Sequence, residues 1–414
     1  MKIALISAKF PFGPKEPYLE AEIRALSEYI EDLTIIPTSP PRRPSRHSDL
    51  PAKVVRMPLI SLRTYIRTIQ LCCSQPGAVL RALRSIIMPR ARFTVRLKNL
   101  VIFPKALAVA DIVQRENIDH IHSYWLSTPS TVAYIAAQIA GKPWSSTAHR
   151  WDIYENNLAH AKAKSAAFMR VISRRGLSDY RKRIGVVHWE RSVALHLGVR
   201  VPPQRAAYPL AARHRPLTLL CAAAFVPVKG HKFLIEALAQ VRDSGYAVRC
   251  YLAGDGPLKG RIAALIRKHR LSAVVTILSE VPHHELMRQL QSGMFDAAVL
   301  PSIEREDQME GIPVALMEAM AVGLPCIATN SGSVTELLDA SCGIVVPQGS
   351  SGALADAIIT LARDVKRGSP LGVLARRRVA EQYDARQTAA VLSALLRRPE
   401  MLEEHSGEFA EMKA

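Results

Sequence analysis

The chain has 414 residues, of which 49% are hydrophobic and 22% are charged, and its formal net charge is +19. This composition excludes an intrinsically disordered chain, and the length is sufficient for two domains with a core each. No stretch approaches the roughly 18–20 consecutive apolar residues of a transmembrane helix. The six cysteines show no Cys-x-x-Cys or His-paired spacing, a pattern that favours a reducing compartment over a metal site. We therefore expect a soluble, cytoplasmic protein.

The N-terminal residues predict a strand, a loop, a helix and a second strand. The apolar run Met1–Ser7 is too short for the core of a signal peptide and favours a buried strand. A loop that contains Gly13 follows, and then a helix from Leu19 to Tyr29 and a strand from Leu33 to Ile36. Residues 37–58 are rich in Pro, Arg and Ser and predict an irregular connection.

A strongly basic segment follows, because no acidic residue occurs between Asp49 and Asp111. Apolar side chains recur there at helical spacing, so we expect a basic helical insertion over about 59–115. Basic amphipathic helices can lie on anionic membranes, which makes a peripheral membrane contact one interpretation. A solvated face over an ordinary insertion is the second, and nucleic-acid binding is the third, although aromatic residues are sparse and no recognition motif occurs. The eleven basic residues are Lys53, Arg56, Arg63, Arg67, Arg81, Arg84, Arg90, Arg92, Arg96, Lys98 and Lys105.

A second series of alternating elements predicts the rest of a Rossmann-like domain with a parallel sheet. A strand over 118–122 ends at His122, a helix spans 129–140, and the next strand leads to His149 and Asp152. A further strand covers 169–173. Pro202 and Pro203 begin a stretch rich in Arg and Pro that predicts a linker, so we place a domain boundary near residue 203.

The second half begins with a strand over 218–223, a loop that contains Lys229, and a helix over 231–241. Free N–H groups and the helix dipole favour an anion at a helix N-terminus, so Lys229 is a candidate phosphate ligand. The alternative is a solvated loop lysine. Strands over 248–253 and 274–278 follow, and they extend the same αβ alternation.

The most informative stretch is a βαβ unit formed by a strand over 296–300, a helix over 314–322 and a strand over 325–328. Glu318 is the only charged residue of that helix. A carboxylate among apolar neighbours is costly unless a donor satisfies it, so it either binds a ligand or lies beside a Lys or Arg of the protein. Glu310 precedes it by eight residues, in the loop before the helix. Two such acceptors suit a ligand rich in hydroxyl groups, such as a sugar or a ribose.

The segment EGIPVALMEAMA, from Glu310 to Ala321, with Gly323 and Pro325 after it, resembles the E-x7-E signature of the retaining GT-B glycosyltransferases, the "group 1" family. The continuation from Ala328 to Glu336 is similar to the Gly-x-x-Glu loop of that family. About forty residues agree in order, which is far more specific than the spacing alone. The residues of the segment EGIPVALMEAMA also resemble those of a subgroup of the family that builds bacterial exopolysaccharides such as colanic acid.

This resemblance implies the α/β GT-B fold, with two Rossmann-like domains facing across a cleft. The expected limits are 1–203 for an acceptor-binding domain and 204–375 for a nucleotide-sugar-binding domain, then a helix over 376–398 that returns to the first domain and an acidic tail over 399–414. It also implies transfer of a sugar from a nucleotide-diphosphate sugar to a glycan or a polyprenyl-linked oligosaccharide, in exopolysaccharide or cell-surface polysaccharide synthesis. No Asp-x-Asp triplet accompanies the motif, so we expect neither a metal ion nor another cofactor.

The resemblance also implies roles for residues of the second half. Glu318 would accept the ribose hydroxyl groups, while Glu310 and the amides of Gly311 and Ile312 would hold the donor sugar. Lys229 would stabilise the leaving diphosphate.

In the first half, His122 and the group His149-x-x-Asp152 resemble two further sequence motifs of the family. His149 would point at the donor sugar and the acceptor, where an imidazole can donate and accept a proton. Gly13 would let the backbone approach the phosphates or sugar of the donor, although a plain turn glycine explains it equally well.

The chain departs from the family pattern at several positions. The family usually has an Arg about five residues before Lys229, where this chain has Ala224. Lys232, Arg305 or an Arg of the first domain are candidates to replace that cation. The other departures are Tyr124 for a His, Arg150 for a Gly and Arg200 for an Asp.

Three other functions remain open. A GT-B nucleotide-sugar epimerase would share the fold, a non-catalytic sugar-nucleotide binder would explain Ala224, and a nucleic-acid binder would explain the charge. A dehydrogenase is disfavoured because the first loop has no Gly-x-Gly-x-x-Gly motif, and no Ser/His/Asp or Cys/His nucleophile motif occurs.

Overall fold

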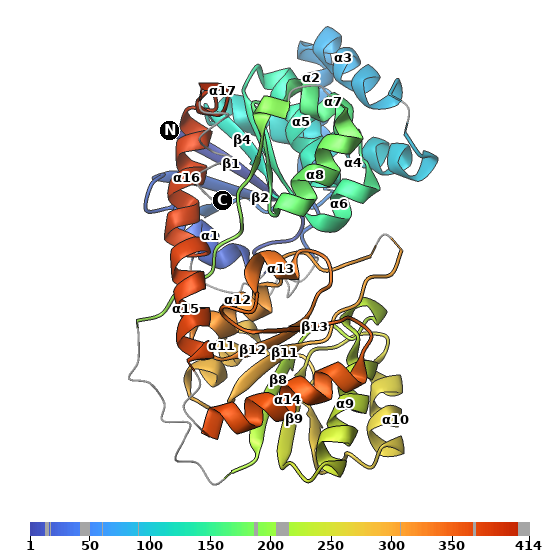
Figure 1. Ribbon diagram of the computed structural model, residues 1–414. Helices are drawn as coiled ribbons and strands as arrows, with labels where there is room; N and C mark the ends of the chain where they lie inside the picture. Colours follow the sequence, from blue (N-terminus) through green and yellow to red (C-terminus); the bar gives the residue numbers. More distant parts are fainter. Residues whose placement is uncertain are drawn as a thin grey trace. The chain divides into compact units, whose positions relative to one another are not determined.

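A computed structural model describes residues 1–12, 16, 18–41, 50–59, 61–89, 91–185, 189–203, 215–306, 308–366 and 370–404. The chain forms two compact units (Figure 1). The first comprises Met1–Gly198 and the chain from Ala385 onward, and the second comprises Val199–Asp384. The chain therefore changes unit at Gly198 and again after Asp384, whereas the sequence suggested limits at 203 and 375.

The first unit is built on a parallel sheet with the strand order β3-β2-β1-β4-β5-β6-β7 over the described residues. The predicted strands are present, and β3 adds a short edge strand inside the segment expected to be irregular. The order reverses between β1 and β4, and in open α/β sheets such a switch point is where ligands bind. The strands are β1 (Lys2–Ser7), β2 (Asp32–Pro37), β3 (Lys53–Val54), β4 (His120–Ser123), β5 (Trp144–Ala148), β6 (Phe168–Val171) and β7 (Ser192–Ala194).

Helices cover both faces of this sheet, because successive strand residues point to opposite sides. Ile3 and Leu5 of β1 pack with α1 and α16, whereas Ala4 and Ile6 pack with α4 and α5. The helices of the unit are α1 (Leu19–Leu26), α2 (Leu62–Ser74), α3 (Pro76–Ile87), α4 (Phe93–Arg115), α5 (Thr128–Ala140), α6 (Arg150–Glu155), α7 (Ala159–Ser165), α8 (Arg174–Ile184), α16 (Ala385–Arg397) and α17 (Met401–Glu404), with a 3-10 turn η1 (Trp189–Arg191).

The predicted basic insertion forms α2, α3 and α4. Leu71 of α2 and Ala82 and Ile86 of α3 are buried in the core cluster that also holds α4 and α5. Lys105 differs from the other basic residues of the segment because it is completely buried, and its ammonium group donates to the carbonyl of Met57. No helix within the described ranges combines the length and the apolar character that crossing a membrane requires.

Burial lowers the pKa of Lys105 from 10.5 to about 7. Because the folded pKa lies below the unfolded one, the folded protein binds fewer protons between pH 7 and pH 10.5, and stability should rise with pH in that window. Replacing Lys105 with Met should remove this contribution. We expect the free energy of unfolding of the wild type, relative to Lys105→Met, to rise by up to ~1.4 kcal/mol per pH unit. Urea titrations of both proteins at pH 7, 8 and 9 test this, and parallel pH profiles would contradict it.

The second unit is a parallel sheet with the strand order β10-β9-β8-β11-β12-β13 over the described residues, and its switch point lies between β8 and β11. The strands are β8 (Leu217–Ala222), β9 (Val248–Ala253), β10 (Val275–Ile277), β11 (Ala297–Leu300), β12 (Cys326–Thr329) and β13 (Ile344–Val346). The helices are α9 (His231–Asp243), α10 (Lys259–Lys268), α11 (His283–Gln291), α12 (Val314–Ala321), α13 (Val334–Leu337), α14 (Ser351–Lys366) and α15 (Leu371–Gln382), with a 3-10 turn η3 (Pro227–Lys229).

The single helix predicted over 376–398 is wrong, because Tyr383 and Asp384 separate α15 from α16. The Tyr383 hydroxyl donates to the carbonyl of Glu336, and its own carbonyl accepts from Val199 N–H. These contacts hold Tyr383 in the second unit, while α16 packs on α1 in the first. A Cβ atom on Gly198 would lie 2.4 Å from Ala385 Cα, so only glycine permits this close approach of the two chain segments.

Candidate functional site

In the second unit, the loops that follow the two switch-point strands meet through a lysine and a glutamate. Lys229 lies in η3 after β8, and Glu310 lies in the loop after β11. The Lys229 ammonium group donates to both carboxylate oxygens of Glu310, at 2.8 and 2.6 Å. Ser302 donates a further hydrogen bond to Glu310, at 2.7 Å. The predicted Lys229 and Glu310 are thus brought together at the edge where this fold class binds ligands.

Two glycines allow the backbones around this pair to approach closely. Gly230 has φ +63°, and a Cβ there would lie 1.9 Å from the carbonyl oxygen of Pro301. Gly332 has φ +59°, and a Cβ there would lie 1.9 Å from the carbonyl oxygen of Glu310. Both conditions exclude any other residue type. Gly332 therefore lets the loop that precedes Glu336 pack against Glu310.

The N–H groups of Gly311 and Ile312 donate to no protein acceptor among the described residues. Ile312 has only 7% of its surface exposed, and Pro313 after it carries no N–H group. Backbone donors rarely stay unsatisfied when they are buried, so donors that are free here suit an acceptor atom supplied by a ligand. This agrees with the expectation that these two amides face the donor sugar.

Glu318 is 92% buried within α12, and its partner is neither a Lys nor an Arg. The Nε2 atom of His283, the first residue of α11, lies 2.6 Å from Oε1 of Glu318. His283 is itself about one-third exposed. Its imidazole contacts one carboxylate oxygen and holds the side chain in place, and no donor among the described residues reaches the second oxygen.

The position of the expected arginine is an exposed alanine, Ala224. Of the candidate replacements, Lys232 is exposed on α9 and lies 3.8 Å from Glu236. Arg305 is exposed, and its backbone pairs with that of Gln308. Within the described residues, neither side chain forms a hydrogen bond or an ion pair with Lys229 or Glu310.

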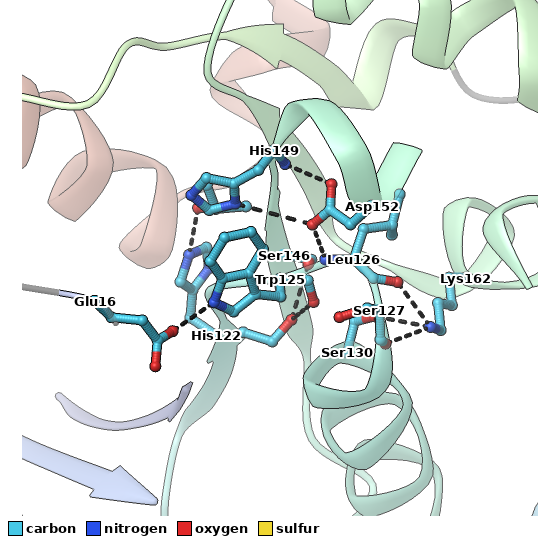
Figure 2. Close-up of polar contacts among 12 residues, drawn as sticks. Glu16, His122, Trp125, Leu126, Ser127, Ser130, Ser146, His149, Asp152 and Lys162 are labelled. Carbon is cyan, nitrogen blue, oxygen red and sulfur yellow. Dashed lines mark hydrogen bonds and ion pairs between the residues drawn. The ribbon is translucent and has the colours of Figure 1, made fainter. Parts of the chain in front are cut away.

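The corresponding loops of the first unit also meet, through Glu16 after β1 and Trp125 after β4 (Figure 2). The Trp125 indole N–H donates to Glu16, and the other carboxylate oxygen of Glu16 accepts the N–H groups of Lys9 and Phe10. The His149 imidazole stacks on Trp125, with 4.0 Å between ring centroids and 27° between ring planes. Glu16 thus fixes the ring that supports the predicted His149.

His149 follows β5 and has only 6% of its surface exposed. Both of its ring nitrogens are buried and have no hydrogen-bond partner among the described residues, and Nδ1 lies 3.9 Å from Oδ2 of Asp152 (Figure 2). Burial, and to a smaller extent the positive charge of Arg170, lower the pKa of His149 to about 3, so the imidazole is neutral at pH 7. A neutral ring can donate from one nitrogen and accept at the other.

Asp152 and Lys162 fix the backbone around this imidazole. Asp152 accepts the N–H groups of His149 and Leu126, each at 2.7 Å. Lys162 donates to the carbonyls of Leu126 and Ser127 and to Ser130 (Figure 2). Burial raises the pKa of Asp152 to about 8 and lowers that of Lys162 to about 7. These residues position the loop after β4 and the start of α6 and do not themselves face solvent.

The remaining first-unit candidates have structural partners or lie outside the described residues. The His122 ring is bonded to Ser145 and Thr147 and is completely buried. Arg150, at the position of the family glycine, pairs with Asp179 of α8. Gly13 lies outside the described residues, so its predicted role stays untested.

Residues 207–378 match the sequence model of the family Glycosyl transferases group 1. That region covers almost the whole second unit and contains Lys229, Glu310 and Glu318. The second unit belongs to glycosyltransferase group 1. The resemblance noted in the sequence is thereby confirmed for this part of the chain.

Two curated relatives of this chain are similar over the same part. The putative colanic acid biosynthesis glycosyltransferase WcaL of Escherichia coli strain K12 is 35% identical over 194 residues, which are 45% of this chain and 47% of the relative. The amylovoran biosynthesis glycosyltransferase AmsK of Erwinia amylovora is 33% identical over 190 residues, which are 44% of this chain and 46% of the relative. The chain thus spans about half the length of the curated relatives it matches.

The fold comparison extends over both units of this chain. The crystal structure of Anabaena Alr3699/HepE in complex with UDP has a TM-score of 0.69 and 16% sequence identity, and the match covers 96% of this chain and 99% of that one. At this identity the likeness concerns the fold alone. The expected GT-B fold, with two Rossmann-like units, is confirmed.

The sequence did not indicate every residue of the candidate site. Ser302 and His283 contact the two signature glutamates, and Trp125 supports His149. Ser302 lies two residues after the end of β11, which borders the switch point. A polar residue directly after such a strand is a signal from which its place in the site could have been predicted. His283 carries no such signal. It begins the helix that follows β10, and β9 and β8 lie between β10 and β11 in the strand order. Within the described residues, no cluster of three His, Cys, Asp or Glu side chains is suited to hold a metal ion.

Proposed function

We propose that this protein transfers a sugar from a nucleotide-diphosphate sugar to a glycan or lipid-linked oligosaccharide, with retention of the anomeric configuration. The observation that carries the proposal is the joined set Lys229–Glu310–Ser302 at the switch point of a group 1 glycosyltransferase unit, with Glu318 held by His283. A metal ion or another cofactor has no part in the proposed reaction.

In the proposed reaction the bond between the anomeric carbon and the diphosphate oxygen breaks, and its electron pair stays with the diphosphate. The acceptor oxygen attacks from the same face, and a phosphate oxygen takes the acceptor's proton. Lys229 stabilises the negative charge that grows on the diphosphate, a preorganised electrostatic contribution. Glu310 and the amides of Gly311 and Ile312 hold the sugar hydroxyl groups.

Glu318 is the proposed ribose ligand, because its second carboxylate oxygen can accept from a hydroxyl group while His283 holds the first. In the first unit, His149 is the proposed contact for the acceptor. Its two nitrogens, which have no hydrogen bond to the described residues, and its neutral state at pH 7 suit a hydroxyl group that both donates and accepts.

We place the reaction in exopolysaccharide or cell-surface polysaccharide synthesis, which is the process named for both curated relatives. HepE was crystallised with UDP, which supports a nucleotide-sugar donor here without fixing the base. A uridine or guanosine diphosphate sugar is the first donor class to test.

A thermal-shift panel of nucleotide-diphosphate sugars tests donor binding. At a concentration of about 100 times Kd, at least one donor should stabilise the protein by ~2.7 kcal/mol and raise Tm by about 5 °C or more. Replacing Glu318 with Ala should weaken that donor by about 10–100-fold, because charge-assisted hydrogen bonds to ribose are lost. Glu285→Ala, on α11 beside His283, is the matched control and should leave the shift unchanged. A full shift in Glu318→Ala would contradict the assignment.

Replacing His283 with Ala tests whether this residue positions Glu318. The carboxylate should remain in place but lose its fixed orientation, so donor affinity should fall by about 3–10-fold, less than in Glu318→Ala. His283→Gln keeps a donor and should restore part of the loss. Equal losses in His283→Ala and Glu318→Ala would mean that His283 contacts the donor directly.

A non-catalytic sugar-nucleotide binder is the second candidate function, and the exposed Ala224 at the usual arginine position favours it. Such a protein would show the thermal shift without releasing nucleoside diphosphate when an acceptor is added. Release that depends on the acceptor would exclude it, and conversion of the donor to an isomeric nucleotide-sugar would indicate an epimerase.

A further inference from the structure

The apolar face of α2 points to solvent. Leu62, Tyr65, Ile66 and Ile69 recur at the spacing of one helix face, and all four are exposed, Leu62 to 77% and Ile69 to 62%. The side of α2 that faces the protein is instead partly polar, since Thr64 is buried and Thr68 donates to the carbonyl of Pro104 in α4. A helix of a globular domain normally has the reverse arrangement, so this face has no partner within the described chain.

The first turns of α4 repeat this arrangement. Phe93, Leu97, Leu100 and Val101 share one face by their spacing, and each is exposed, Phe93 to 78%. On the other side of the same turns Val95, Asn99 and Ile102 are buried. Met88, at the end of the intervening α3, is also 78% exposed. The three helices contact one another, and we name their exposed apolar side chains the α2–α4 face.

Figure 1 shows α2 and α3 at the outer margin of the first unit, beyond α4 and α5, which cover the sheet. The face therefore belongs to the insertion and not to the core of the Rossmann-like unit. None of its residues takes part in the candidate sites described above.

The segment that carries this face has charges of one sign in its sequence, although Arg67 of α2 pairs with Asp111 and Lys98 of α4 pairs with Glu155. From Leu62 to Val101 the sequence contains eight Lys or Arg residues and no Asp or Glu. Arg81, Arg84 and Arg92 are exposed, and no carboxylate of the described residues pairs with them. The surface thus combines apolar side chains that avoid water with cations that have no protein counterion.

We propose that the α2–α4 face binds the surface of a membrane rich in anionic lipid, with its apolar side chains in the interface and its arginines on the headgroups. This choice of partner needs both the exposed apolar side chains and the arginines that pair with no carboxylate of the described residues. Exposed aliphatic side chains gain free energy on entering the acyl boundary, and cations gain it from anionic headgroups. The described helices are not suited to cross the bilayer, so the protein would lie on the surface.

Two other occupants fit less well. A second copy of this chain would bring two sets of unpaired arginines together in a symmetric interface, and like charges oppose such a contact. A nucleic acid would satisfy the arginines, but it would leave Leu62, Ile69 and Met88 without an apolar partner.

The proposal is independent of the sugar-transfer reaction, but it would place the enzyme next to lipid-linked acceptors if the proposed function is correct. Vesicle binding tests the membrane contact, and the donor thermal shift tests the proposed sugar transfer. Either can fail without affecting the other.

Co-sedimentation of the full chain with phosphatidylcholine vesicles, with and without 30% phosphatidylglycerol, is the direct measurement. We expect binding to the anionic vesicles and little to the neutral ones, and 0.5 M NaCl should weaken it. Ile69→Asp and Phe93→Asp should each lower the partition coefficient by about tenfold. Val373→Asp, at a 59% exposed apolar position on α15, is the matched control and should bind like the wild type.

A charge-reversal pair tests the electrostatic contribution separately. Arg81→Glu with Arg84→Glu should lower binding by about a hundredfold at low salt, whereas Arg267→Glu with Lys268→Glu on α10, with the same change in net charge, should have a much smaller effect. All four residues are exposed, so circular dichroism should show an unchanged fold.

Three results would overturn the proposal. The first is wild-type binding that does not distinguish anionic from neutral vesicles, or no binding at all. The second is binding that Ile69→Asp and Phe93→Asp leave unchanged. The third is a dimer, or a complex with duplex DNA, that these variants abolish while vesicle binding persists.

Discussion

Replacing Glu310 with Gln is expected to lower kcat by about 10²–10³-fold, the usual effect of removing one preorganised electrostatic contact from a transition state. The Glu310 carboxylate accepts two contacts from Lys229 and one from Ser302. Glutamine keeps the shape but loses the charge, so it no longer fixes the ammonium group. Steady-state release of nucleoside diphosphate, with the donor found by thermal shift, measures the change.

Glu236→Gln on α9 is the matched control, because Glu236 also pairs with a lysine of the same unit but lies outside the loops after β8 and β11. It should retain the wild-type kcat. A double-mutant cycle with Lys229→Ala should show strong coupling, since the two side chains contact each other directly. If Glu310→Gln retains more than half of the wild-type kcat, the pair has only a structural role.

Much of the architecture could be predicted because its signals are local. Many of the parallel strands are short runs of largely apolar residues, such as Ala297–Leu300, and several of the helices between them begin or end near Pro or Gly. The Glu310–Glu318 spacing places both carboxylates after the same strand. The prediction of a single helix over 376–398 failed for the opposite reason. The chain leaves the helix at Tyr383, whose contacts are with Glu336 and Val199, far away in the sequence.

In the candidate site, too, some features have a local sequence signal and others depend on residues distant in the sequence. Lys229 and Glu310 could be proposed from their motifs, but their direct contact joins residues 81 positions apart. The pairing of Glu318 with His283 and the stacking of Trp125 on His149 likewise have no local signal. The sequence showed that the segment over 59–115 is basic and amphipathic, but it could not show which side of each helix faces the protein. Burial of Thr64 and exposure of Ile69 reverse the usual arrangement, and only packing reveals this.

Replacing Glu22 with Ala is expected to destabilise the first unit by about 3–5 kcal/mol, because it would leave a buried arginine without its counterion. Arg170 of β6 donates to both carboxylate oxygens of Glu22 in α1, each at 2.7 Å, and both side chains are almost completely buried. Arg170 also donates to the carbonyls of Leu195 and His196. Two neutral carbonyls cannot replace the charge of the lost carboxylate.

Glu20→Ala on the same helix is the matched control. Glu20 pairs with Arg24 at the surface, so its loss should change the free energy of unfolding by less than about 1 kcal/mol. The double variant Glu22→Met with Arg170→Met should recover much of the stability lost in Glu22→Ala, since it removes both buried charges. Urea titrations of the four proteins measure these differences. A small effect of Glu22→Ala would show that Arg170 reaches water or another anion.

The position of this pair also predicts where the effect appears. Arg170 ties β6 to the segment after β7, which runs to Gly198, where the chain leaves the first unit. The second unit has its own core and contains neither partner of the pair. Glu22→Ala should therefore lower the thermal transition of the first unit by about 10 °C, while the transition that a bound donor raises stays in place. A donor shift lost together with the first transition would mean that the two units unfold as one.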